Sequence, residues 1–217
     1  MTESDSPPLN RAARRRVATH NDLLDAVRSL MMKHVGPNFT VTEITDLADV
    51  APGTFYNHFD DRDAAIDAAL LRDVEAHDRA VERLQFEGMD AVDRLAMLYT
   101  VNIHRVFNHP NWASFAVASY GMRRWPSLDT PGPAHPIIVD GIAEGSMGIS
   151  DAVTGWLLTR HLLIGLAERL IIATDLDMLA TSREILDACA TILDFDRGRV
   201  NDMSHRDLAE LAGTTWE

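Results

Sequence analysis

The spacing of the apolar residues is the feature that most constrains the fold of this chain. Apolar side chains recur every three or four positions in one segment after another, which places them on one face of an α-helix. The first such stripe follows Val17 and stops before Gly36-Pro37, a pair that ends helices. No segment alternates apolar and polar residues for long enough to indicate a β-strand. The sequence therefore predicts an all-α protein.

Several further helices are expected, each opening near a capping residue or a proline. The expected helices cover residues 17–35, 41–48, 52–59, 61–86, 90–107, 110–122, 136–144, 151–173 and 177–195. Residues 126–136 contain four prolines and a glycine, and they are expected to form a loop.

The sharpest local signal lies at residues 39–44. Thr40 and Glu43 have the spacing of a capping box, in which each side chain accepts a hydrogen bond from the other residue's backbone N–H. Phe39 and Ile44 stand where a hydrophobic staple would close the start of the helix. A second short helix is expected to open at Pro52, where the missing N–H of proline costs nothing. Two short helices after a longer one predict a helix-turn-helix unit.

In a helix-turn-helix unit the second short helix presents its first residues to the major groove of DNA. Phe55 and Phe59 are suited to hold this helix against its neighbours. Its outer face would then offer hydroxyl, amide, imidazole and aromatic groups to phosphates and base edges. The candidate residues on that face are Pro52, Thr54, Tyr56, Asn57 and His58. A small three-helix unit with no role in DNA binding would show a similar pattern, and the spacing alone leaves both interpretations open.

The charge distribution restricts any nucleic-acid contact to the beginning of the chain. The net charge is −13, which argues against a general binder of polyanions. Within residues 11–16, however, the only charged side chains are arginines, and Arg14 and Arg16 are the candidates for a contact with DNA. A short basic segment can equally be a solvated tail.

The segment from Thr40 to Arg62 closely resembles the DNA-binding signature of the tetracycline-repressor (TetR) family of transcriptional regulators, most clearly in the run Gly53-Thr-Phe-Tyr-Asn-His-Phe59. The resemblance implies that Thr42, Pro52, Thr54, Tyr56, Asn57 and His58 lie at or near DNA. It also implies that Arg62 contacts a phosphate, a role that lysine usually fills in the family.

Two residues depart from the family pattern. Asp49 replaces the usual glycine of the turn, although aspartate tolerates the left-handed conformation better than most residues. Ala51 replaces the serine or threonine that normally caps the recognition helix, a loss of about 1 kcal/mol.

The resemblance implies two domains, although its residue-level match ends near Leu70. We expect a flexible arm over residues 1–10, a DNA-binding domain over 11–60, a helical effector-binding and dimerisation domain over 61–200, and a tail with a possible short helix over 201–217.

Family members pair through their last two long helices. The segment 152–173 supports this arrangement, because it is apolar nearly all round and needs cover on two sides. Burial inside a large monomer would also explain this pattern. The expected interface residues are Trp156, Leu163, Leu170, Ile185, Cys189 and Ile192.

An aromatic-rich region in the larger domain suggests a site for a small apolar or aromatic effector, although such clusters also form ordinary cores. Its candidate residues are His104, Phe107, Trp112, Phe115, Tyr120, Met122 and Trp125.

The sequence offers little for other functions. Cys189 is the only cysteine, so no disulfide framework or paired-cysteine metal site is expected. No catalytic or phosphate-loop motif is present, and we expect no enzyme activity, cofactor or metal. No signal segment or membrane span is evident, which favours the cytoplasm.

The expected function is therefore that of a ligand-responsive repressor that binds a palindromic operator in double-stranded DNA as a homodimer. The alternatives are a ligand-independent DNA-binding protein, including an activator, and a small-molecule-binding or enzymatic helical protein whose DNA-binding head no longer functions.

Overall fold

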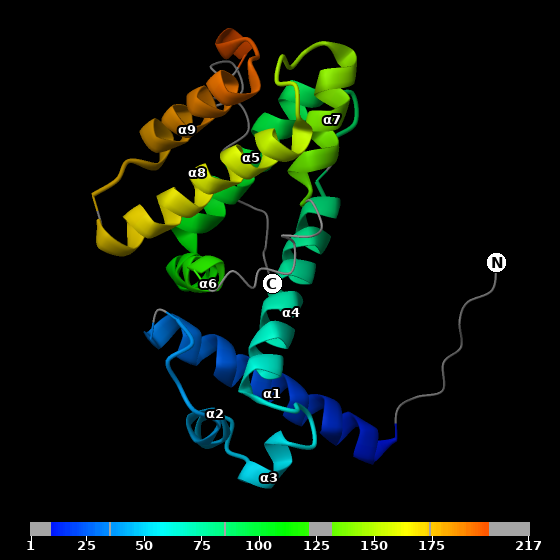
Figure 1. Ribbon diagram of the computed structural model, residues 1–217, viewed down its shortest axis with the longest axis vertical. Coiled ribbons are helices and arrows are strands. Elements are labelled where there is room, and N and C mark those ends of the chain that lie inside the picture. The colour runs from blue at the N-terminus through cyan, green and yellow to red at the C-terminus, as the bar shows by residue number, and fades with distance from the viewer. Residues whose placement is uncertain (1–9, 35, 85, 122–131, 174, 200–217) are drawn as a thin grey trace, which may run out of the picture. The chain divides into compact units, whose positions relative to one another are not determined.

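The computed structural model describes residues 10–34, 36–84, 86–121, 132–173 and 175–199, and every regular element within them is a helix (Figure 1). The all-α prediction is confirmed. The chain divides into two compact units, residues 1–71 and 72–217. The expected domain boundary at residue 60 follows the helix-turn-helix segment, whereas the first unit also takes in the start of α4 (Arg62–Glu82). The expected arm, as far as residue 9, and the expected tail lie outside the described residues.

The first unit contains α1 (Arg11–His34), α2 (Val41–Leu47), α3 (Pro52–Phe55) and the beginning of α4. Its core is formed by fully buried aliphatic and aromatic side chains, among them Leu23, Val27, Met31, Ile44, Phe55, Ile66 and Leu70.

Helix α1 begins at Arg11, earlier than the expected start at Val17. The Asn10 side chain accepts a hydrogen bond from the backbone N–H of Ala13 at 2.8 Å, so Asn10 caps the helix. Alanine and arginine, which fill the segment before Val17, are strong helix formers. The apolar stripe used to place the start therefore marks only the part of α1 that faces the core.

The capping box at the start of α2 is confirmed. The Thr40 hydroxyl accepts a hydrogen bond from the Glu43 backbone N–H at 3.2 Å, and Glu43 Oε2 accepts one from the Thr40 backbone N–H at 2.8 Å. The bonds from Thr40 lower the pKa of Glu43. Phe39 and Ile44 are both buried, as expected for a staple.

The two residues that depart from the family pattern, Asp49 and Ala51, lie in the turn before α3. Asp49 adopts a φ of 52°, the left-handed conformation expected of it. Ala51 occupies the N-cap position without a side-chain hydrogen bond, so the loss of the cap is confirmed. The helix ends at Phe55 rather than Phe59, because tight i→i−3 hydrogen bonds from Asn57 and His58 replace helical ones.

The second unit contains the rest of α4 with α5 (Ala91–Asn108), α6 (Pro110–Gly121), α7 (Ala134–Glu144), α8 (Ala152–Ile172) and α9 (Met178–Leu193). Helix α5 is its centre, because it packs against α6, α7, α8 and α9. Figure 1 shows α8 and α9 side by side, with α5 next to both.

Three aspartates start helices in this unit as the sequence predicts. The Asp90, Asp151 and Asp177 carboxylates each accept a hydrogen bond from the backbone N–H three residues on. The expected loop over 126–136 is wrong at its end, since α7 already begins at Ala134. Pro136 lies in the first turn of α7, where its missing N–H leaves no bond unmade. Residues 126–131 of that loop lie outside the described residues.

No helix in the described part of the chain is at once long and apolar enough to cross a lipid bilayer.

Candidate nucleic-acid interface

The segment from α3 to Phe59 has one buried side and one exposed side. Phe55 and Phe59 are buried with their ring centroids 5.5 Å apart, which fixes the segment to the core of the first unit. Tyr56 packs edge-on against Phe55, with 60% of its surface exposed. Pro52 and Asn57 are also exposed, whereas Thr54 and His58 are half-buried. The predicted division between core-facing and outward-facing residues is therefore present.

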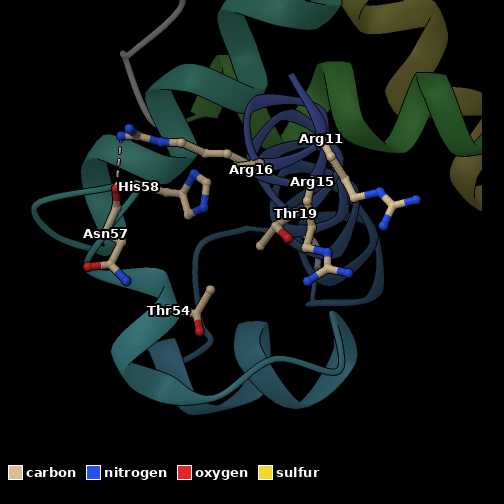
Figure 2. A pocket seen from close by; sticks show the side chains of 8 residues that line it. Arg11, Arg15, Arg16, Thr19, Thr54, Asn57 and His58 are labelled. Carbon is tan, nitrogen blue, oxygen red and sulfur yellow. Dashed lines mark hydrogen bonds between the residues drawn. The ribbon is translucent and has the colours of Figure 1, made fainter. Parts of the chain in front are cut away.

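A hollow of about 760 Å³ lies between α1 and α3 within the first unit (Figure 2). Figure 2 shows Arg11, Arg15 and Thr19 on α1, with Thr54 and Asn57 across from them. Residues four apart share one face of a helix, so the α1 residues form a single column. The complete lining is Arg11, Ala12, Arg15, Arg16, Thr19, Thr54, Asn57 and His58. The hollow thus combines the guanidinium groups of α1 with the hydroxyl of Thr54 on α3 and with the amide of Asn57 and the imidazole of His58, which follow α3.

Arg16 and His20 of α1 contact residues 57–59, which follow α3. The Arg16 guanidinium donates a hydrogen bond to the backbone carbonyl of Asn57 at 3.4 Å. The His20 ring stacks on Phe59, with 4.9 Å between centroids and 28° between planes. Burial, with a contribution from the positive charge of Arg16, lowers the pKa of His58. His58 is therefore a neutral imidazole at pH 7, with one nitrogen to donate and one to accept a hydrogen bond.

The structure brings together only some of the residues expected at DNA. Arg16, Thr54, Asn57 and His58 line the hollow. The other expected residues of this face do not line it, although each is exposed: Arg14, Thr42, Pro52 and Tyr56.

Three polar residues of the hollow were missed by the sequence analysis: Arg11, Arg15 and Thr19. Their four-residue spacing would have revealed them had α1 been extended back to Arg11.

Arg62 makes contacts that the sequence did not predict. Its guanidinium donates hydrogen bonds to the carbonyls of Pro37 at 3.2 Å and Phe39 at 3.1 Å. It also forms an ion pair with Asp63 at 3.1 Å. These bonds connect the first residue of α4 to the loop before α2, so Arg62 serves the structure of the first unit.

Solved structures with a similar arrangement of helices include regulators of transcription. A TetR-family transcriptional regulator from Haemophilus influenzae matches with a TM-score of 0.60 at 14% identity, over 81% of this chain and 98% of that chain. RolR in complex with resorcinol matches with a TM-score of 0.64 at 21% identity, over 89% and 96%. FadR from Bacillus subtilis in complex with stearoyl-CoA matches with a TM-score of 0.60 at 15% identity, over 78% and 97%. No protein-family model and no curated protein sequence matches the chain.

The chain has the TetR-family fold. The two short helices of the helix-turn-helix unit predicted from the sequence are α2 and α3 of the first unit.

The expected effector residues of the TetR fold lie in different environments. Phe115 is fully buried, and Phe107 and Trp112 are partly buried against the core of the second unit. His104 is half-buried, and burial lowers its pKa. The Tyr120 side chain, Met122 and Trp125 lie outside the described part of the structure.

The residues expected at the dimer interface differ in how deeply they are buried. Trp156, Ile185 and Cys189 are buried within their own chain, so in this conformation they are core residues, inaccessible to a partner. Burial raises the pKa of Cys189 to about 12, which leaves its thiol protonated and unreactive. The other expected interface residues are only partly buried: Leu163, Leu170 and Ile192.

The two glycines of α8 differ in how closely other residues approach them. A Cβ atom on Gly155 would lie 2.7 Å from Leu193 of α9, so this glycine permits the close packing of α8 and α9. A Cβ atom on Gly165 would meet nothing within 4 Å.

Proposed function

We propose that this protein is a sequence-specific DNA-binding regulator of transcription, acting in the cytoplasm as a ligand-responsive repressor that binds a palindromic operator as a dimer. The observation that carries this proposal is the hollow where α1 and α3 meet. There the polar groups of residues 52–59, which we propose as the recognition segment, lie beside a column of arginines. The resemblance of residues 40–62 to the TetR signature and the TetR-family fold of the described residues support the same function.

The chemistry of the hollow suits the backbone and the bases of DNA. Arg11 and Arg15 offer planar forks of N–H donors, the geometry that binds phosphate oxygens in pairs. Asn57 offers an amide that can donate to and accept from the edge of adenine, and Thr54 offers a hydroxyl. His58, being neutral, adds one donor or acceptor without adding charge. The α1 residues would thus position the protein on DNA, and the α3 residues would read sequence.

The charge of the chain restricts contact with DNA to one small part of its surface. The protein carries a net charge of −13, so most of its surface repels DNA. The arginines of residues 11–16 are exposed on α1, beside the recognition segment. Binding should therefore depend on this one face and on salt concentration.

Dimerisation through α8 and α9 would supply the second recognition segment. Helix α8 exposes large apolar side chains, of which Leu158 is 48% and Ile172 is 83% exposed, together with Val153 and Ile171. The open space beside Gly165 would allow a partner helix to approach closely. A two-fold dimer places two recognition segments on half-sites about one helical turn of DNA apart.

An effector would act by changing the balance between two conformations. RolR and FadR were solved with small molecules, and a site in the second unit of this chain would work in the same way. Helix α4 belongs to both units, so a ligand with different affinities for two positions of α4 would shift DNA affinity.

The deciding experiment is selection of bound sequences from a random DNA pool at about 0.15 M salt. The native protein would be compared with an Asn57→Ala, Tyr56→Ala double variant and with Asn21→Ala, which removes an exposed amide from α1 outside the hollow. We expect the native protein and Asn21→Ala to enrich one palindrome, and the double variant to enrich none. Failure of the native protein to enrich any sequence would contradict the proposal.

A further inference from the structure

Arg16 lies on a different side of α1 from the other two arginines of the hollow. Figure 2 shows the side chains of Arg11 and Arg15 on one side of α1 and the side chain of Arg16 directed to the other, toward residue 57. Arg11 and Arg15 are four residues apart and share one face of the helix, whereas consecutive residues lie about 100° apart around the helix axis. Arg16 therefore shares its face with His20, four residues further on.

Arg16 and His20 together hold the backbone of residues 57–59. The Arg16 guanidinium donates to the Asn57 carbonyl at 3.4 Å, and the His20 ring stacks on the buried ring of Phe59. In the described part of the chain no backbone N–H donates to the Asn57 carbonyl, because α3 has already ended. Arg16 therefore supplies the protein hydrogen bond that fixes the direction of this peptide group.

The residue whose carbonyl Arg16 holds is also the one suited to read a base. The Asn57 side chain is exposed, and Figure 2 shows its amide on the side of the backbone away from Arg16. An asparagine amide recognises adenine when its nitrogen and its oxygen both face the base edge. The backbone at residue 57 limits where that amide can point, so a contact that fixes the carbonyl also orients the amide.

The charge of Arg16 acts on the next residue as well. Burial, followed by the charge of Arg16, lowers the pKa of His58. The Arg16 guanidinium thus influences two successive residues of the recognition segment. Arg11 and Arg15, by contrast, are exposed on the other side of α1, where their N–H donors face the hollow.

We propose that Arg16 is a positioning residue that orients Asn57 for base reading, while Arg11 and Arg15 make the phosphate contacts. This inference rests on the proposed function and divides the work of the hollow between two faces of α1. Loss of Arg16 should therefore reduce the discrimination between bases. Loss of Arg15 should reduce the electrostatic part of binding, which does not depend on sequence.

The test begins with the palindrome that the native protein selects, in which Asn57→Ala identifies the base pair that Asn57 reads. Fluorescence anisotropy then measures binding to the palindrome, and to a duplex with that base pair changed in both half-sites, at about 0.05–0.2 M salt. A good amide contact discriminates between bases by about tenfold, and Arg16→Met should lower this ratio by about threefold or more. The slope of log Kd against log salt should stay close to native.

Arg15→Met should give the opposite result. It should keep the discrimination at that base pair and reduce the salt slope by about 0.9 for each chain, or about 2 for a dimer. Asn21→Ala, at an exposed position of α1 outside the hollow, is the control and should alter neither quantity.

Further variants separate positioning from direct contact with DNA. In the Asn57→Ala background, Arg16→Met should lower discrimination no further, because no amide remains to be oriented. Arg16→Lys should restore most of the discrimination, since its ammonium can still donate to the carbonyl. Circular dichroism checks the folding of each variant. Arg16→Gln, whose amide is two bonds shorter and falls short of the carbonyl, replaces the methionine variant if that variant has not folded.

Three results would overturn the inference and leave the proposed function standing. In the first, Arg16→Met keeps the discrimination and reduces the salt slope as Arg15→Met does. In the second, Asn57→Ala leaves every base preference of the native protein unchanged. In the third, Arg16→Met lowers discrimination further in the Asn57→Ala background. Failure of the native protein to enrich any palindrome would instead remove the proposed function, and this inference with it.

Discussion

Arg62 shows how one side chain can serve the fold at a position where the family resemblance implies a contact with DNA. The Pro37 and Phe39 carbonyls lie in the loop between α1 and α2, where no helical hydrogen bond is available to them. The hydrogen bonds from Arg62 satisfy both acceptors. The ion pair with Asp63 is half-exposed and contributes little by comparison.

We therefore expect Arg62→Met to lower the free energy of unfolding by about 1–3 kcal/mol, because two carbonyls lose a charged donor. Urea denaturation measures this change. Arg14→Met, which alters a fully exposed arginine, should change stability by less than about 0.5 kcal/mol. A variant of Arg62 with native stability but much weaker DNA binding would instead support the phosphate contact.

His77 makes the stability of the protein depend on pH. Burial, followed by the charge of Arg105, whose Nη1 lies 2.9 Å from its Nδ1, lowers its pKa from 6.5 to about 3 in the folded chain. Between these values the unfolded chain binds a proton that the folded chain does not, so stability is lost as the pH falls below about 6.5. Urea denaturation at pH 7.5 and pH 5 should show a loss from this residue of about 1–2 kcal/mol.

His77→Asn, which keeps a hydrogen-bond acceptor near the position of Nδ1, should remove that part of the loss. His109→Asn changes an exposed histidine and should leave the loss unchanged. An identical loss in the native protein and in His77→Asn would show that His77 does not titrate in this way.

At the scale of elements, α3 is the weakest part of the DNA-binding unit. Its four residues start at an N-cap without a side-chain hydrogen bond. The backbone of Ala51 is nonetheless extended, with φ −66° and ψ 144°, as an N-cap requires.

Ala51→Ser should therefore stabilise the protein by about 0.5–1 kcal/mol, since a hydroxyl there can accept a backbone N–H. Thermal unfolding provides the measurement. Ala12→Ser, at an exposed position inside α1, is the control and should not stabilise. No gain from Ala51→Ser would indicate that the start of α3 is already satisfied in some other way.

The same elements show what a sequence can predict. The capping box and the left-handed Asp49 depend on neighbours in the chain, and both were predicted correctly. The start of α1 was missed because its first residues have no apolar stripe. The outward-facing residues of α3 could be predicted from the helical spacing. The contacts of Arg62 could not, because its partner Pro37 is distant in the sequence and approaches it only in the folded unit. The burial of Arg105 on α5 was not predicted, because charged residues normally lie at the surface.

At the scale of the molecule, the exposed apolar side of α8 predicts a dimer that charge can disrupt. Leu158→Glu combined with Ile171→Glu should convert a dimer to a monomer in sedimentation experiments, because two carboxylates per chain would be buried unpaired. Operator affinity should fall with dimerisation, since both half-sites must be read together. Leu71→Glu changes an equally exposed leucine in the first unit and should leave the dimer intact. A native protein that sediments as a monomer would contradict this prediction.

The path of α4 has a consequence for how the protein melts. The helix contributes Ile66 and Leu70 to the core of the first unit and Val81 to that of the second. When either core unfolds, the part of α4 that packs against it loses its support. The helix then frays, and this weakens its packing against the other core. The two units should therefore lose structure in one cooperative step in calorimetry. A short operator duplex, although it touches only the first unit, would then delay melting of the second as well.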